Sequence, residues 1–208
     1  RISVIESSPH TAGAAYVAAK RNQLGDRQPY LYKTTDYGAT WTRIDAKLPR
    51  DEFTHVIRED STRRGLLYAG TERGVWVSWD DGANWSSSRL NMPVTPVTDL
   101  KVEKNDLVIA SHGRGFWALE NIAPLRQATP DAAQRPVHLF TPAGVYREAY
   151  PAQIDFLLGA AASGATLDIL DAAGQVVRSL TLDDQLKAGH HRIEWNLRTR
   201  GATVFPGM

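Results

Sequence analysis

Short runs of apolar or alternating residues, separated by polar turns that contain glycine, organise the first part of the chain. One stretch shows four such runs clearly, at residues 54–59, 65–70, 74–79 and 85–90. Runs of this length and alternation predict β-strands. No stretch holds a sustained helical period, and Pro and Gly recur too often for a long helix. The pattern therefore predicts an all-β chain.

The strand pattern repeats along the chain. The segments 34–41 and 78–85 carry the same punctuation 44 positions apart, and the apolar segments that precede them are 52 positions apart. The difference places an insertion at residues 20–29 of the first copy. A third, less regular copy covers residues 100–117. A period of about 40–50 residues with four short strands per copy is typical of a β-propeller blade.

A turn of eight residues recurs in the first two copies. Its carboxylate can accept backbone N–H groups two or three residues further on, its glycine can adopt a positive φ, and its tryptophan offers a large face to bury against the neighbouring sheet. Catalytic carboxylates or calcium ligands are the alternative. Recurrence at one blade period and the lack of alternating oxygen ligands favour a structural role. The predicted structural residues are Asp36, Gly38, Trp41, Asp80, Gly82 and Trp85.

Composition and charge exclude several classes of function. The 208 residues include 24 Lys and Arg against 23 Asp and Glu, so the net charge of +1 offers no strong field for nucleic acid or an anionic membrane. The best apolar run, residues 156–162, is far shorter than the about 20 residues of a membrane-spanning helix. The absence of cysteine excludes disulfides, thiolate zinc sites and thiol catalysis. The six histidines show no metal-ligand spacing, so we expect no metal and no cofactor.

The repeated turn carries a resemblance to a known family. Residues 34–41 match the Asp-box of bacterial neuraminidase repeats (S/T-x-D-x-G-x-T/S-W) at every fixed position, and residues 78–85 depart from it at Asn84. Residues 110–122 resemble the last blade of bacterial "glycosyl hydrolase" proteins with sortilin-like repeats. Families similar to these include sialidases, xyloglucan-cleaving endoglucanases, photosystem assembly factors and peptide-binding sortilins. The resemblance therefore implies the fold and leaves enzyme, binder and assembly factor open.

The composition changes after residue 127. Residues 128–136 are small, polar and bounded by proline, which predicts a linker. Beyond them, residues 137–208 contain four short strand patterns at about ten-residue spacing, typical of a small β-sandwich. Residues 167–178 and 188–197 resemble the immunoglobulin-like domain of flagellar hook-capping proteins. Such a domain is often joined to secreted bacterial propellers, so the resemblance implies a secreted or periplasmic protein.

Both halves are expected to be incomplete. Two blades and most of a third cannot close a propeller, because closure takes at least about four. We therefore expect residues 1–127 to be the C-terminal blades of a larger propeller and residues 137–208 to be a partial sandwich. The remaining blades, from the same parent protein or another chain, are then a partner of this one. The predicted architecture is a partial β-propeller of two to three blades followed by a partial immunoglobulin-like β-sandwich.

Function is expected at the end of the blades opposite the Asp-box turns, where the turns between second and third strands and the connections between blades gather. Carboxylates there can serve as acid, base or nucleophile on a glycoside, and cations can clamp an anionic group. The candidate catalytic residues are Glu72 and Asp51, and the candidate ligand-binding residues are Arg73, His112, Arg114 and Glu52. The alternative for each is a solvated surface charge or a brace between blades.

The resemblance and the candidates together indicate a propeller that binds a glycan or a peptide. A glycoside hydrolase acting on a polysaccharide or a sialylated glycan is the alternative. A sialidase would need three arginines and a Tyr/Glu nucleophile pair, and the sequence offers no such set. Neither a serine nucleophile elbow nor a phosphate-binding glycine loop is present.

Overall fold

The computed structural model describes residues 1–88, 91–129, 132–146, 151–182 and 185–199. It divides the chain into two compact units, Arg1–Ile122 and Ala123–Met208, which we describe separately. Both units are built almost entirely of antiparallel strands, which confirms the predicted fold class. The predicted linker, residues 128–136, stays a prediction, and residues 130 and 131 lie outside the described part of the chain.

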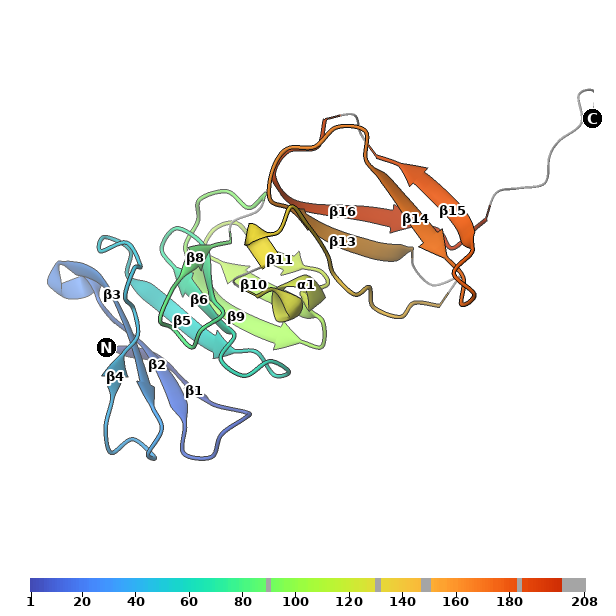
Figure 1. Cartoon of the computed structure of the whole chain (residues 1–208). Helices are drawn as coiled ribbons and strands as arrows, with labels where there is room; N and C mark the ends of the chain where they lie inside the picture. The colour runs from blue at the N-terminus through green and yellow to red at the C-terminus, as the bar shows by residue number, and fades with distance from the viewer. Residues whose placement is uncertain (89–90, 130–131, 147–150, 183–184, 200–208) are drawn as a thin grey trace, which may run out of the picture. The chain divides into compact units, whose positions relative to one another are not determined.

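The first unit consists of three up-and-down sheets, which we call blades 1, 2 and 3 (Figure 1). Blade 1 contains β1 (Ile2–Ser7), β2 (Ala15–Arg21), β3 (Asp26–Thr34) and β4 (Thr42–Arg43). Blade 2 contains β5 (Thr54–Glu59), β6 (Leu67–Thr71), β7 (Val75–Ser78) and β8 (Ser86–Ser87). Blade 3 contains β9 (Val97–Glu103), β10 (Asp106–Ser111) and β11 (Phe116–Leu119). The inserted segment forms a turn of 3₁₀ helix, η1 (Asn22–Leu24), between β2 and β3.

Blades 1 and 2 share a hydrophobic core. Alternation along each strand sends one set of side chains toward the neighbouring blade. Tyr16 and Leu31 of blade 1 pack there with Ile57, Leu67 and Trp85 of blade 2. The core between the blades is therefore assembled from residues far apart in the sequence.

Gly70 lets blades 2 and 3 approach closely. A Cβ atom at this position would lie 2.6 Å from Cγ1 of Val56 and 2.7 Å from the carbonyl oxygen of Val97 on β9. Both distances are too short for any larger side chain, because one of the close atoms belongs to the backbone. The glycine in β6 is thus required by packing between blades.

The repeated turn owes its shape to its carboxylate. Asp36 accepts hydrogen bonds from the backbone N and the hydroxyl of Thr40, at 2.9 and 2.6 Å, and from the hydroxyl of Thr34 at 2.7 Å. In blade 2, Asp80 accepts from the backbone N of Asn84 at 2.8 Å and from the Ser78 hydroxyl at 2.9 Å. The carboxylates reach the fourth residue further on, beyond the two or three residues expected, because the turn is wider than an Asx turn.

Both glycines of these turns match the prediction, whereas only one of the two tryptophans does. Gly38 and Gly82 both have φ of +88°, as the turn requires. Trp85 is 6% exposed and donates from Nε1 to the Ile44 carbonyl oxygen at 2.8 Å. Trp41 is 44% exposed, so the prediction that it is buried against a neighbouring sheet is wrong for this chain. Trp85 has blade 1 to pack on, whereas no described blade stands on the other side of blade 1.

The outer face of blade 1 is apolar and uncovered. Ile5 occupies the repeat position of Ile57, 52 residues later, yet Ile5 is 63% exposed and Ile57 is fully buried. Burial at this position therefore depends on whether a blade precedes it.

The second unit holds two antiparallel sheets. They are β12 (Val137–Leu139) with β13 (Ala152–Leu158) and β16 (Gly189–Trp195), and β14 (Thr166–Leu170) with β15 (Val176–Thr181). Phe156, Leu158 and Leu186 form its core. Gly174 has φ of +79° in the hairpin turn between β14 and β15, as predicted. Two short helices, α1 (Ala123–Gln127) and η2 (Ala132–Gln134), were not predicted, because a single turn has no period to recognise.

One buried ionic group lies in this unit. The buried Asp155 carboxylate accepts from His190 Nε2 and Arg192 Nε, both at 2.8 Å. Burial raises the pKa of Asp155, but the hydrogen bonds from His190 and Arg192 outweigh it and hold the pKa below its usual value. This cluster joins β13 to β16 and stabilises the sheet.

Candidate functional site

The two ends of the blades are built differently (Figure 1). The turns between third and fourth strands, with Asp36 and Asp80, lie at one end. The turn with η1 and the starts of β1, β5 and β9 lie at the other end, because antiparallel strands alternate in direction. The second end is the one at which the sequence predicts function.

A β-bulge recurs at this second end in all three blades. The register of the first strand against the second skips one residue in each blade, and the skipped residues are Ser3, His55 and Thr98. A bulge bends its strand and re-aims a side chain, and bulges are common next to active sites. We call this the bulge end of the blades. It presents a hydroxyl, an imidazole and a second hydroxyl from equivalent places.

A second set of equivalent residues follows the bulges. The backbone N–H of Lys20 donates to the carbonyl oxygen of Arg1 at 2.9 Å, and His112 donates in the same way to Pro96 at 2.8 Å. The backbone N–H of Glu72 makes the corresponding bond in blade 2, to Phe53 at 3.2 Å. Each blade therefore places one side chain from the end of its second strand beside its bulge.

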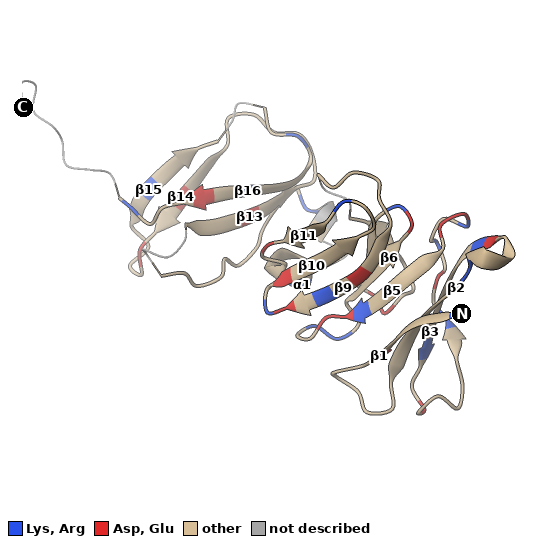
Figure 2. Cartoon of the chain, turned by 180° about the vertical axis from the view of Figure 1, so that it is seen from behind, with Lys and Arg blue, Asp and Glu red and all other residues tan. Residues whose placement is uncertain are grey.

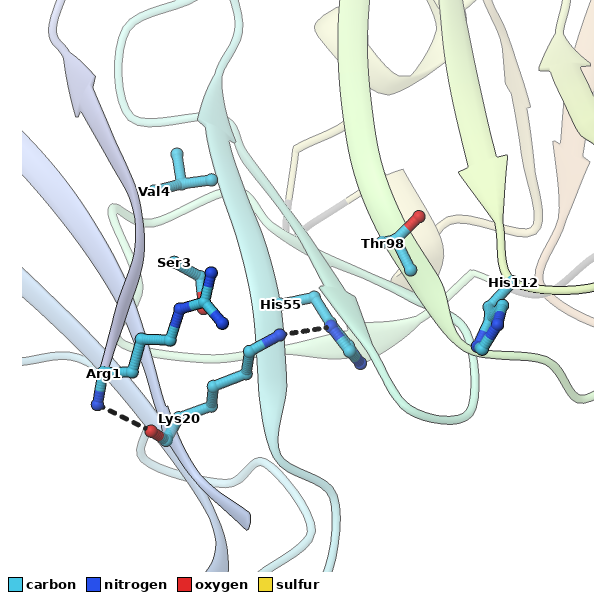
Figure 3. Close-up of a pocket in the computed structure, with 7 residues that line it drawn as sticks. All are labelled: Arg1, Ser3, Val4, Lys20, His55, Thr98 and His112. Carbon is cyan, nitrogen blue, oxygen red and sulfur yellow. Dashed lines mark hydrogen bonds between the residues drawn. The ribbon is translucent and has the colours of Figure 1, made fainter. Parts of the chain in front are cut away.

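These residues surround a pocket of about 410 Å³ (Figure 3). The residues that line it are Arg1, Ser3, Val4, Lys20, His55, Thr98 and His112. They come from all three blades of the first unit. Among the described residues, the lining of this pocket includes no Asp or Glu and no Phe, Tyr or Trp.

His55 is the central group of the pocket. Lys20 Nζ lies 3.3 Å from His55 Nδ1, and the two side chains point toward each other (Figure 3). Burial, followed by the positive charges of Lys20 and His112, lowers the pKa of His55 to about 4. The imidazole is therefore neutral near pH 7. Because an ammonium can only donate, we assign the ring hydrogen to Nε2.

Two polar atoms at the bulges are left without partners. Within the described part of the chain, His55 Nε2 and Ser3 Oγ are buried and form no hydrogen bond. Most buried polar atoms in proteins are hydrogen-bonded, so two exceptions at equivalent repeat positions are informative.

The predicted catalytic residues lie at or near the bulge end, but each is engaged. Glu72 forms an ion pair with Arg27, on the inserted segment. Asp51 lies 2.7 Å from Arg73 in another ion pair. Neither carboxylate is among the described residues that line the pocket. Their catalytic role stays a prediction.

The predicted ligand-binding residues fall in different surroundings. Glu52 is buried and accepts from Thr71 Oγ1 at 3.0 Å and Trp76 Nε1 at 3.2 Å. Arg73 lies 3.7 Å from Glu52 as well as near Asp51. His112 lines the pocket, whereas the exposed Arg114 does not appear in its described lining. The structure thus brings His112 alone of these four into the pocket.

Sequence reasoning missed Lys20, Ser3, His55 and Thr98. The repeat offset of 52 residues does align Ser3 with His55 and Lys20 with Glu72. That alignment could have marked the positions, but it could not reveal that each first strand bulges there.

Among the described residues, no group of three or more His, Cys, Asp or Glu could hold a metal ion. No helix in the described ranges is long and apolar enough to cross a membrane. Charged residues of both signs follow one another along the loops and strand ends of the first unit (Figure 2).

One protein family matches the last part of the chain. The FlgD Ig-like domain family matches residues 146–207, which confirms the resemblance predicted for this half. Part of that match (residues 147–150, 183–184 and 200–207) lies outside the described residues. No curated protein matches the sequence.

Solved structures that are similar to this chain include GH74 enzymes and YCF48. A GH74 enzyme from Niastella koreensis is 14% identical with a TM-score of 0.46, over 86% of this chain and 30% of that one. The GH74 xyloglucanase from Xanthomonas campestris is 16% identical with a TM-score of 0.42, over 75% and 27%. YCF48 bound to D1 peptide is 16% identical with a TM-score of 0.41, over 83% and 50%. The chain therefore spans at most half the length of these structures.

Proposed function

We propose that this chain is part of a secreted or periplasmic propeller protein that binds a glycan or a peptide in the pocket at the bulge end. The observation that carries the proposal is the repeated bulge. It delivers one polar side chain per blade, Ser3, His55 and Thr98, to a single pocket of about 410 Å³. Pockets with a few convergent polar groups are the usual location of ligand sites.

The polar groups of the pocket favour binding over hydrolysis. Hydrolysis of a glycoside generally uses a pair of carboxyl groups on either side of the scissile bond. The described lining of the pocket contains none, and the candidates Glu72 and Asp51 are held in ion pairs with arginines. Apart from Val4, the side chains that line the pocket are hydrogen-bond donors and cations, which can hold a ligand in place.

The alternative is a glycoside hydrolase acting on a polysaccharide or a sialylated glycan. One observation favours it: Glu72 stands at the same repeat position as Lys20 and His112. If further blades add a second carboxylate opposite Glu72, the same end could act on a glycosidic bond. In this case Glu72, which is paired with Arg27, would be the nucleophile or base.

The remaining blades are proposed as a partner. Ile5 and Trp41 of blade 1 are exposed. The residues at the same repeat positions in blade 2, Ile57 and Trp85, are buried against blade 1. We therefore propose that a further blade of the same type, from the same parent protein or another chain, packs on this face. Bacterial Asp-box propellers with sortilin-like repeats are the family proposed for the first unit.

Binding to the chain can be measured with a panel of neutral oligosaccharides, sialyllactose, oligogalacturonate and short peptides, while product formation is followed in the same samples. We expect saturable binding without turnover. Thr98→Trp fills the pocket with a bulky ring and should abolish binding, whereas Thr166→Trp, on an exposed position of β14, should leave it unchanged.

Two outcomes would contradict the proposal. If Thr98→Trp binds as the original chain does, the ligand does not use this pocket. If product accumulates in proportion to time and Glu72→Gln stops it, the hydrolase alternative replaces the binding proposal.

A further inference from the structure

Cations in the pocket are left without anionic partners. Elsewhere in the first unit, Arg27, Arg43 and Arg58 each form an ion pair with a carboxylate. Neither the Arg1 guanidinium nor the Lys20 ammonium pairs with a carboxylate of the described residues, although both line the pocket. Unpaired positive charge in a concave, partly desolvated place attracts an anion more strongly than the same charge on an open surface.

The hydrogen-bonding groups beside these cations also require an acceptor. His55 bears its ring hydrogen on Nε2, which points to no acceptor in the described chain, and the Ser3 hydroxyl is likewise unpartnered. A buried donor without a partner is energetically unfavourable. A ligand oxygen that draws these side chains toward itself would satisfy both donors.

We propose that the pocket is a carboxylate site, in which Lys20 supplies the charge and His55 Nε2–H and Ser3 Oγ–H supply directed hydrogen bonds to the oxygens. This inference rests on the proposed binding function and names the ligand group. His55 contributes a donor and no charge, so the charge beside these donors comes from the Lys20 ammonium, and the unpaired Arg1 guanidinium is a second cation of the lining.

An acidic peptide fits the pocket better than an acidic glycan. Binding sites for sugars commonly place an aromatic ring against the apolar face of the pyranose. The described lining here has no Phe, Tyr or Trp ring, and Phe53, whose ring centroid is 5.0 Å from that of His55, is buried. A side-chain carboxylate on a flexible stem needs only the cation and the donors. We therefore assign the pocket to an Asp or Glu side chain of a peptide.

The test compares two short peptides, capped at both ends, that differ only in a central Glu or Gln. Their affinity for the full chain is measured by calorimetry, with trigalacturonate as the acidic sugar. We expect the Glu peptide to bind at least about tenfold more tightly than the Gln peptide, since hydrogen bonds to charged groups are roughly twice as strong as neutral ones. Lys20→Met should remove most of this preference. Lys101→Met, which also removes one positive charge but lies on an exposed position of β9, should retain it.

The outcomes separate this inference from the proposed function. Equal affinity for the two peptides, with both lost in Thr98→Trp, would overturn the carboxylate site and leave the binding function standing. Preference for the Glu peptide that survives both Lys20→Met and Thr98→Trp would overturn both proposals. Tight binding of trigalacturonate without binding of the Glu peptide would overturn the assignment to a peptide.

Discussion

The repeated polar groups at the two ends of the blades differ in how completely they are satisfied, although Glu59 Oε2, at the turn end of β5, is also buried without a partner among the described residues. At the turn end, the Asp36 carboxylate accepts bonds from Thr40 and Thr34, and these hydrogen bonds, led by that from the Thr40 hydroxyl, lower its pKa to about 2. At the bulge end, His55 Nε2 and Ser3 Oγ are buried with no partner among the described residues. Both ends belong to the same strands.

The two ends also differ in what they repeat. The turn end repeats its chemistry, since Asp36 and Asp80 make the same bonds 44 positions apart. The bulge end repeats its backbone geometry but varies its side chains, as Ser3, His55 and Thr98 show. Repeated chemistry specifies a fold, whereas a repeated frame with varied and unsatisfied groups is suited to recognising a ligand.

The largest expected effect lies at the turn end. Trp85→Ala should lower the free energy of unfolding of the first unit by about 3–5 kcal/mol, because it removes a ring from the core between blades 1 and 2. Trp41→Ala, at the matching but half-exposed position, should lower it by less than about 1 kcal/mol. Both changes are measured by urea unfolding, monitored through spectroscopic signals that arise from residues of blade 2. Equal losses would mean that blade 1 has a covered outer face in solution.

A smaller effect of a different kind is expected at the bulge end. His55→Leu replaces a buried, partly unpaired polar ring with an apolar side chain, so at pH 7 the free energy of unfolding should change by less than about 1 kcal/mol. The change in pH dependence is more telling. The pKa of His55 is about 4 in the folded chain and 6.5 when unperturbed, so the unfolded chain binds more protons between these values.

The free energy of unfolding must then fall as the pH is lowered from about 6.5 to about 4. His55→Leu should lose less stability over this interval than the original chain. Urea midpoints at pH 7 and pH 4.5 measure the difference. Asp36, Asp80 and Asp155 give a pH dependence of the same sign, but they are present in both chains, so the difference between the two chains reports on His55. If both chains lose the same stability between pH 7 and pH 4.5, His55 is not held neutral by its surroundings.

The turn end and the bulge end also differ in how much of their structure could be predicted from the sequence. Asp36 and Gly38 act within one turn of eight residues, so the turn and the blade period could be predicted from the local sequence pattern. The exposure of Trp41 could not, because it depends on a neighbouring blade that a local pattern does not reveal.

The pocket was harder to predict than the fold. His112 was found because it lies in an evident turn between two strands. Lys20 and His55 meet across 35 residues, and the contact exists because a bulge turns His55 toward the end of β2. Strand register is set by pairing between strands, so a bulge leaves little trace in a single sequence.

The central claim is that a ligand binds at the bulge end. The imidazole signals of the histidines in the chain can test it. Of its six histidines, His55 and His112 line the pocket, while His10 lies at the turn end of the first unit and His138, His190 and His191 belong to the second unit. Nuclear magnetic resonance of the imidazole signals, recorded while any binding member of the ligand panel is added, should show shifts for His55 and His112 and none for the other four. Shifts at the other four with His55 and His112 unchanged would contradict the account.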